Sequence, residues 1–394
     1  MIYNFTTRRQ RDRHPAVPPV DAWTPGPGSD REPNVTMPMP DRVAPAPESL
    51  QARPLIIDTL GGLANPNLDD GGDSIRAVDR RALDDAVASG LAAIHQTVGY
   101  VSGDADPYAK SLDDVAAWNA LIDQHADVLA RVLRADDILR ARDSGRIGVI
   151  LGFQNGTMLA DAPARAREFA ARGVRVIQLT YNGANPLGDG AMATGNRGLT
   201  ARGHEVVAAL NEARVLVDLS HGAPATCRAA ARASTAPVVI SHTGCRALAD
   251  LPRNAGDEEM RAVAERGGVV GIYFMPFLVR DRQPTADDLI AHLEHAIDVC
   301  GEEHVCIGTD GAVPRIDDMP SYLVALDREV AERRAAGIGA TGECGDIVPF
   351  LPDLQGPEKF RDLARRLLAR GHAPSRVEGI LGRNFLRCAR EVWG

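Results

Sequence analysis

Two histidines stand at the ends of two consecutive apolar runs, where their imidazole groups could share one ligand. His221 closes the segment VLVDLSH (215–221), and His242 closes PVVISH (237–242). Two neutral imidazoles on adjacent strands can bind one divalent metal ion, or they can carry a proton to and from a substrate. We therefore predict that His221 and His242 face the same site, as metal ligands or as catalytic groups.

Other polar residues end apolar runs in the same way along the chain. Asp310 closes HVCIGTD (304–310) and could supply an oxygen ligand or act as a general acid or base. A single polar residue at a strand end is ordinarily a hydrogen-bonded boundary residue, whereas eight that converge on one rim indicate a site. The eight polar ends are Asp58, the His95–Gln96 region, Gln154, Tyr181, His221, His242, Tyr273 and Asp310.

These polar ends belong to eight short apolar runs that alternate with amphipathic segments rich in Ala, Arg and Glu. Continuous apolar strands that are covered by helices form parallel sheets. Eight strand–helix units in one domain favour an α/β fold of the (β/α)₈ type, the TIM barrel, whose active site lies at the C-terminal strand ends. The expected strands are 54–58, 90–100, 146–154, 174–181, 215–221, 237–242, 267–274 and 304–310.

The chain divides into a tail and one domain. Residues 1–51 are rich in Pro, Arg, Asp and Ser and have no periodic apolar face, so we expect a disordered tail. From PLIIDTLGGL onward the composition stays uniform, and no later linker interrupts it. We therefore assign residues 52–394 to a single barrel domain.

Composition and charge limit the partners and the location. The 394 residues carry a net charge of −9, which argues against a surface that binds nucleic acid through its charge. No apolar run approaches the roughly 20 residues that span a bilayer, and none follows the basic N-terminus as in a signal sequence. The six cysteines lack CxxC spacing, which is typical of reduced thiols. We expect a cytoplasmic protein that acts on a small molecule.

A long stretch of the chain resembles a known family. The membrane (renal) dipeptidase family of metallopeptidases is similar to the segment GLTARGHEVVAALNEARVLVDLSHGAPATCRAAARASTAPVVISHTGCRALADLPRNAGDEEMRAVAERGGVVGIYF. The similarity continues through HVCIGTD and GILGRNFLRC and extends more loosely back to residue 54. The resemblance implies a (β/α)₈ barrel of the metal-dependent hydrolase type, a two-zinc site and a homodimer. It also implies hydrolysis of dipeptides, often with a D-configured C-terminal residue.

The resemblance assigns roles to four residues that this chain shares with the family. His221 and His242 match the two histidine ligands of one zinc ion. Arg253, in LPRN, matches the arginine that binds the substrate carboxylate, a role that suits its planar pair of donors. Asp310 matches the aspartate that serves as acid and base beside the metals. We therefore expect a small substrate that bears a carboxylate.

The chain departs from the family at other positions of the two-zinc site. The family's His-x-Asp on the first strand falls on Leu60 and Gly62, which offer no donor atom to a metal. Its bridging glutamate falls on Gln154, whose neutral amide cannot supply the charge that holds two cations about 4 Å apart. Its substrate-contacting histidine falls on Tyr181, in LTYNGAN. We therefore predict at most one bound divalent metal ion, zinc.

Three functions agree with this residue set. The first is a dipeptidase-like hydrolase. The second is a non-hydrolytic acid–base enzyme of specialised metabolism that uses one metal or none and acts on an amino-acid-like substrate. The third is a catalytically silent barrel that binds a ligand through Arg253. Both histidines are retained beside the lost ligands, which favours a working site. The predicted metal ligands are His221 and His242, the predicted catalytic residues are His221, His242, Tyr181 and Asp310, and the predicted substrate-binding residues are Arg253, Gln154, Tyr181 and Asn182.

Overall fold

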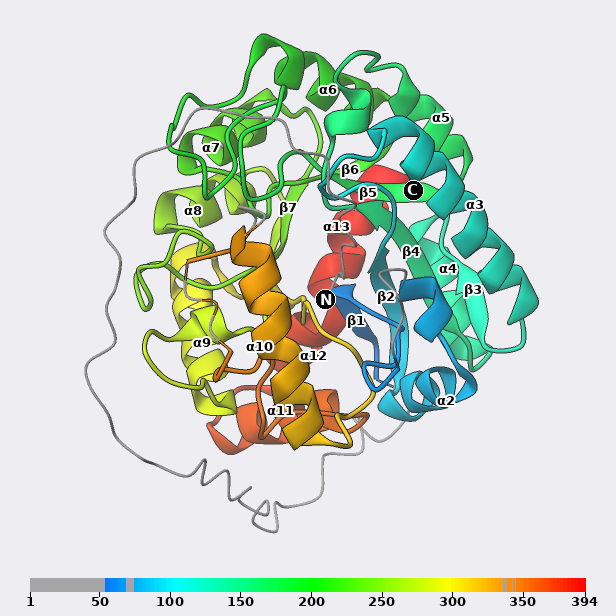
Figure 1. Ribbon diagram of the computed structural model, residues 1–394, viewed down its shortest axis with the longest axis vertical. Helices are drawn as coiled ribbons and strands as arrows, with labels where there is room; N and C mark the ends of the chain where they lie inside the picture. The colour runs from blue at the N-terminus through cyan, green and yellow to red at the C-terminus, as the bar shows by residue number, and fades with distance from the viewer. Residues whose placement is uncertain (1–53, 69–73, 336–338, 342, 344) are drawn as a thin grey trace.

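The computed structural model describes residues 54–394 except 69–73, 336–338, 342 and 344. Its centre is a parallel barrel (Figure 1) whose principal strands follow the order β1-β2-β4-β5-β6-β7-β8-β9. Each of these strands overlaps one of the ranges expected from the sequence, so the predicted TIM barrel is confirmed. The tail expected over 1–51 lies outside the described residues. The strands are β1 Ile56–Gly61, β2 Leu91–Thr97, β4 Ile147–Phe153, β5 Val174–Gln178, β6 Leu216–Asp218, β7 Val238–Thr243, β8 Val269–Ile272 and β9 Val305–Ile307.

One short strand was not expected from the sequence. β3 (Leu129–Arg131) pairs in parallel with the first residues of β4. Three residues are too few to show either an alternating or a continuous apolar pattern, and so no sequence signal marks this strand.

The barrel closes between its last and first strands through backbone contacts beyond their ends. The amide of Asp310 donates to Leu60 O (2.8 Å), and the amide of Gly62 donates to Gly311 O (3.1 Å). A parallel bridge also joins Gly62 to Ala312. The loop after β1 therefore lies beside the loop after β9, and the two form one side of the barrel mouth.

Helices surround the barrel, and side-chain caps fix several of their first turns. The side chains of Asp79, Asp106 and Thr200 each accept a hydrogen bond from a backbone amide in the first turn of the helix that follows. None of the helices in the described ranges is long and apolar enough to cross a membrane. The helices are α2 Arg80–Ser89, α3 Pro107–Gln124, α4 Ala135–Asp143, α5 Arg165–Ala171, α6 Ala201–Glu212, α7 Pro224–Ala233, α8 Asp257–Glu265, α9 Ala286–Cys300, α10 Met319–Ala335, α11 Lys359–Ala369, α12 Pro374–Glu378 and α13 Asn384–Trp393.

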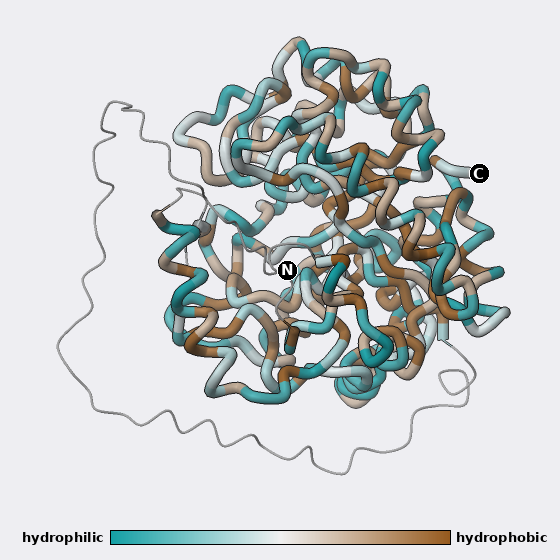
Figure 2. Tube along the Cα trace, turned by 45° about the vertical axis from the view of Figure 1, so that its right-hand side comes forward, coloured by the Kyte–Doolittle hydropathy of each residue, from teal (hydrophilic) through white to brown (hydrophobic). Residues whose placement is uncertain are grey.

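An apolar cluster closes the N-terminal end of the barrel. Each principal strand, from β1 with Ile57 to β9 with Cys306, contributes at least one buried residue to the same cluster as Phe385 and Trp393 of α13. Figure 1 shows α13, in red, behind the centre of the barrel, and Figure 2 shows hydrophobic stretches (brown) concentrated in the interior. Burial of this surface stabilises that end of the barrel. The polar strand ends lie at the opposite end.

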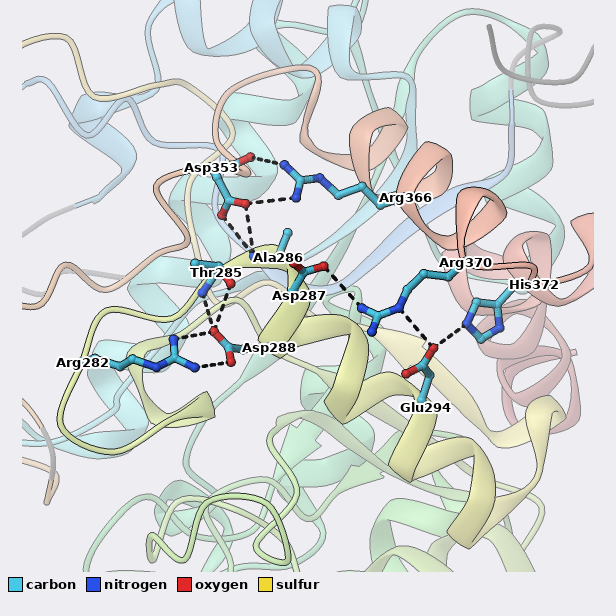
Figure 3. A network of polar contacts seen from close by, with 10 residues as sticks. All are labelled: Arg282, Thr285, Ala286, Asp287, Asp288, Glu294, Asp353, Arg366, Arg370 and His372. Carbon is cyan, nitrogen blue, oxygen red and sulfur yellow. Dashed lines mark hydrogen bonds and ion pairs between the residues drawn. The ribbon is translucent and has the colours of Figure 1, made fainter. Parts of the chain in front are cut away.

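The segment between β9 and α11 adds α10 and an extended stretch to the mouth. In Figure 1, α10 (orange) lies between α9 and the centre of the barrel. Gln283, just before α9, donates to Phe350 O (2.9 Å), and Asp353 accepts a hydrogen bond from the amide of Ala286 (3.0 Å). Figure 3 shows Asp353 between the start of α9 and Arg366 of α11. These contacts fix the extended stretch against two helices.

Candidate active site

A small pocket at the mouth of the barrel gathers most of the predicted site residues. It has a volume of about 80 Å³ and also includes Arg333 and Glu343, which the sequence did not predict. His242 is fully buried and contacts His221 from the neighbouring strand. The predicted residues that line the pocket are Gln154, Tyr181, Asn182, His221, Arg253 and Asp310.

Three other polar strand ends do not line this pocket. The buried carboxylate of Asp58 accepts hydrogen bonds from the amide (2.8 Å) and the hydroxyl (2.6 Å) of Thr309. His95 is buried in β2, with its Nδ1 2.8 Å from a carbonyl oxygen of β1. Tyr273 is buried and donates its hydroxyl to Asn254. These groups bond to neighbouring strands or loops, so a polar strand end does not by itself identify a site residue.

His221 and His242 point their Nε2 atoms at each other. The two atoms are 2.9 Å apart, and the ring centroids are 4.9 Å apart with the planes at 63°. His221 has a φ of 60°, in the left-handed region that residues other than glycine seldom occupy. Backbone strain of this kind persists where the surrounding structure enforces it, often at functional sites.

The Nδ1 atoms of the two rings determine what the facing Nε2 atoms can bind. His242 Nδ1 lies 2.8 Å from Ser241 Oγ, whose hydroxyl donates to Asp218 Oδ2 at 2.5 Å. Because Asp218 uses that hydroxyl hydrogen, His242 Nδ1 carries a hydrogen and donates it to Ser241. His221 Nδ1 likewise donates to Asn182 Oδ1, at 2.8 Å. Both Nε2 atoms therefore present lone pairs, which repel each other unless a cation lies between them.

Burial and nearby charge keep both imidazoles neutral. Burial lowers the pKa of His221 and of His242 well below the usual value, and the charge of Arg253 lowers both pKa values further. A neutral imidazole whose Nδ1 hydrogen is engaged is the form that binds a metal through Nε2. The pair therefore fits one divalent cation.

The donor set fits one metal ion but not two. Within the described ranges, no three His, Cys, Asp or Glu side chains are grouped so as to hold a metal. Catalytic zinc ordinarily has three protein ligands and a water, so an ion on the two imidazoles would need further ligands from water or substrate. On the other side of the mouth, Leu60 is buried and apolar, and Gln154 donates to Thr97 Oγ1 at 2.8 Å. Neither residue offers the charge that a second ion requires.

Arg253 supplies an unused hydrogen-bond donor to the pocket. Its side chain is buried, at 4% exposure, and its NH1 atom has no hydrogen-bond partner among the residues that the structure describes. Buried charged donors are ordinarily paired, because an unpaired one loses its solvation without compensation. A guanidinium also matches a carboxylate in shape. The pocket can therefore bind a carboxylate near the two imidazoles.

Tyr181 covers the face of His221 and connects it to α10. The two rings are stacked, with centroids 4.3 Å apart and planes at 26°. The Tyr181 hydroxyl also hydrogen-bonds to Arg333 of α10, whose guanidinium pairs with Glu343 at 3.0 Å. Burial raises the pKa of Tyr181, so its hydroxyl stays protonated at neutral pH. No sequence signal marks Arg333 as a site residue, because it lies in an arginine-rich helix with no motif around it.

Asp310 faces the same pocket from the residues after β9. Its φ of 55° also lies in the left-handed region. Burial raises the pKa of its carboxyl above the usual value, which brings its proton exchange closer to neutral pH. These are the properties of a general acid or base.

Known proteins resemble the chain over most of the barrel. The profile described as membrane dipeptidase (peptidase family M19) matches residues 78–322. The dipeptidase verJ of Clonostachys rogersoniana is 31% identical over 284 residues, which are 72% of this chain and 65% of that protein. An uncharacterized dipeptidase of Schizosaccharomyces pombe, C965.12, is 30% identical over 292 residues, 72% of this chain and 61% of that protein. The chain thus spans less than two thirds of the length of either relative.

A solved structure agrees with the same relationship. The amidohydrolase from Pseudomonas aeruginosa is 28% identical, with a TM-score of 0.74 over 88% of this chain and 99% of that chain. The matched profile covers more than half of this chain and includes the segment that carries His221, His242 and Asp310. The chain belongs to the membrane dipeptidase family, peptidase family M19.

Proposed function

We propose that the chain is a dipeptidase-like hydrolase that cleaves a dipeptide, or a related small amide that bears a carboxylate. The proposal includes one divalent metal ion, zinc, held by His221 and His242. The observation that carries it is that the Nε2 atoms of the two neutral imidazoles lie 2.9 Å apart. They adjoin a pocket that Arg253 lines with an unpaired donor. Membership of the family and the dipeptidases among the relatives support the same reaction.

The predicted polar residues of the pocket each have a role in the proposed reaction. Arg253 binds the substrate carboxylate and so places the neighbouring amide at the imidazole pair. A divalent metal, when bound by the two histidines, would act as a Lewis acid that polarises the amide carbonyl. Tyr181 donates a hydrogen bond to the carbonyl oxygen as negative charge develops there. Asp310 takes a proton from the attacking water and returns it to the departing amine.

Two neutral residues complete the proposed pocket. Asn182 accepts the Nδ1 hydrogen of His221 and thereby keeps its Nε2 unprotonated. Gln154 lines the pocket with an amide that can hydrogen-bond to substrate without adding charge. The substrate contacts of both residues are part of the proposal.

The proposal is tested by adding zinc to metal-free protein and measuring amino-acid release from a panel of dipeptides. L-Ala-D-Ala belongs in the panel, because a metallo peptidase from Rhodobacter sphaeroides has been solved with its phosphinate mimic. We expect one equivalent of zinc to bind and to support hydrolysis. Two tightly bound equivalents would contradict the single-metal assignment. Zinc binding without hydrolysis of any panel member would contradict the reaction.

A second candidate function is a non-hydrolytic acid–base reaction in which the two imidazoles work without a metal. The observation in its favour is the 2.9 Å between the Nε2 atoms, which is shorter than the spacing of two nitrogens that share one zinc ion. Two nitrogens on one tetrahedral zinc at about 2.0–2.1 Å would lie about 3.3 Å apart. Turnover of an amino-acid-like substrate that survives exhaustive chelation would favour this second function.

We also propose a cytoplasmic location and a homodimer. The five cysteines in the described part of the chain are unpaired, which suits a reducing compartment. The homodimer follows from the family resemblance alone. Light scattering on the purified protein would test the dimer, and cell fractionation would test the location.

A further inference from the structure

A second and larger cavity lies beside the candidate site. It has a volume of about 730 Å³, against about 80 Å³ for the site itself. Small-molecule pockets ordinarily measure about 300–1,000 Å³, so the site alone holds little more than the reacting part of a substrate. Leu326 and Glu329 of α10, together with Pro349, line both cavities. The remainder of a substrate therefore has room directly beyond this shared wall.

The two cavities also adjoin at Asp310. Asp310 lines the site, while its neighbours Thr309 and Gly311 line the second cavity. Gly62, which stands where the family has an aspartate ligand, lines the second cavity as well. Because glycine has no side chain, the position of the lost carboxylate is left as space. The acyl part of a substrate, opposite the carboxylate held by Arg253, would extend past Asp310 into this space.

A buried lysine lines the second cavity. Lys359, the first residue of α11, is 3% exposed, and its Nζ donates to Ala312 O at 3.0 Å. An ammonium has three donor hydrogens, and this carbonyl uses one of them. Burial lowers the pKa of Lys359 to about 8, and the charge of Asp58 opposes this shift, so the ammonium form persists at neutral pH. Lys359 shares its charge with Asp58, and acidic residues also line the cavity, so an anion there would depend on the remaining donors of the ammonium.

Ion pairs join the C-terminal end of α11 to α9. Figure 3 shows Arg370, the residue after α11, between Asp287 and Glu294 of α9, and Arg366 of α11 bonded to Asp353. Lys359 is the first residue of α11, so its side chain is carried on a helix rather than on a loop.

We propose that the second cavity is a substrate subsite that selects a carboxylate on the acyl part of the substrate through Lys359. The substrate class is then a small amide with a carboxylate at each end. This inference rests on the proposed function for the orientation of the substrate. Ala312 lies two residues beyond Asp310, at most about 7.6 Å away between Cα atoms, and Lys359 Nζ lies 3.0 Å from the carbonyl oxygen of Ala312, so the lysine lies toward the end of the site that Asp310 lines.

The chain offers a clean spectroscopic test because Lys110 and Lys359 are its two lysines. Lys110 is exposed on α3, where it pairs with Asp114. Protein grown with lysine labelled with ¹³C at Cε gives two side-chain signals, and Lys110→Arg assigns them. The probes are N-succinylglycine, an amide with two carboxylates, and N-butyrylglycine, which has the same number of acyl carbons and one carboxylate.

We expect saturating N-succinylglycine to shift the Lys359 signal and to leave the Lys110 signal unchanged. Calorimetry should show N-succinylglycine binding about 10-fold more tightly than N-butyrylglycine, the size of one charge-assisted hydrogen bond. Equal affinities, no binding of N-succinylglycine, or an unmoved Lys359 signal at saturation would each overturn the proposal.

Variants separate this subsite from the proposed reaction. Lys359→Met should reduce the affinity for N-succinylglycine to that for N-butyrylglycine, Arg253→Met should weaken both, and the control Lys110→Met should change neither. If Lys359→Met fails to fold, the signals of the unaltered protein decide the question. A Lys359 shift without hydrolysis of N-succinylglycine by the zinc-loaded protein would contradict the proposed reaction and leave the subsite standing.

Discussion

The two sides of the barrel mouth contain different chemistry. On the side of β6 and β7, His221 and His242 face each other, and Ser241 and Asn182 engage their Nδ1 atoms. On the side of β1 and β4 lie the apolar Leu60, Gly62 and the neutral amide of Gln154, and a cavity of about 730 Å³ adjoins this side. Each side is fixed by its own hydrogen bonds. The two sides therefore differ in what they can bind.

A buried aspartate lies behind each side of the mouth. Asp218, behind the histidines, accepts hydrogen bonds from Ser220 and Ser241. Asp58, on the other side, accepts its hydrogen bonds from Thr309. Thr59 of β1 joins the two sets, because its hydroxyl donates to Ser241 O at 2.6 Å.

The largest expected effect is on the histidine side. His242→Ala should abolish zinc binding and lower kcat/KM by about 10³-fold, because a Lewis acid contributes several kcal/mol to the reaction. Elemental analysis and a dipeptide assay would measure both effects. His204→Ala, an exposed histidine on α6, is the matched control and should change neither. One equivalent of zinc retained by His242→Ala would refute the ligand assignment.

On the other side, Asp58→Asn should alter stability rather than metal content. Burial raises the pKa of Asp58 from 3.8 to about 6. The folded state thus binds this proton more tightly than the unfolded state, and the associated stability, present below about pH 4, is lost as the pH rises through about 6. The shift of about 2 units corresponds to up to about 3 kcal/mol.

Urea unfolding between pH 4 and pH 7 would measure this loss. The difference in unfolding free energy between the unaltered protein and Asp58→Asn should change across that range. Asp161→Asn, at an exposed position, is the control, and its unfolding free energy should differ from that of the unaltered protein by the same amount at every pH. A difference for Asp58→Asn that stays constant across this pH range would show that the proton of Asp58 does not contribute to the pH dependence of stability.

Arg253→Lys tests whether the histidine side binds the substrate carboxylate. The substitution keeps the charge but removes the planar pair of donors, so we expect kcat/KM to fall by about 10- to 100-fold. A dipeptide amidated at its C-terminus is the matched substrate, and both proteins should cleave it at the same low rate. Equal activity on the free dipeptide would remove Arg253 from the site.

The smallest expected effect is that of Tyr181→Phe. Loss of one hydroxyl that bonds more strongly in the transition state should lower kcat by about 10-fold with little change in KM. Tyr108→Phe, whose hydroxyl donates to Glu168 outside the pocket, is the control. A rise in KM at constant kcat would instead assign Tyr181 to substrate binding alone.

The sequence by itself determined the barrel and half of the site. Short apolar runs that alternate with amphipathic segments are typical of parallel strands covered by helices, and all eight expected strands are present. The polar residue after each run marks a position near the mouth, and this placed His221, His242 and Asp310 correctly. The same signal failed to separate them from Asp58 and Tyr273, because it does not report which neighbour a side chain contacts.

Only the tertiary structure decided which side chains meet in the site. The facing Nε2 atoms depend on the left-handed backbone at His221 and on acceptors from other strands. Arg333 and Lys359 come from segments beyond the last strand, and packing and ion pairs with α9 and Glu343 place them. Those placements depend on many weak contacts between distant segments. No local pattern in the sequence records the sum of such contacts.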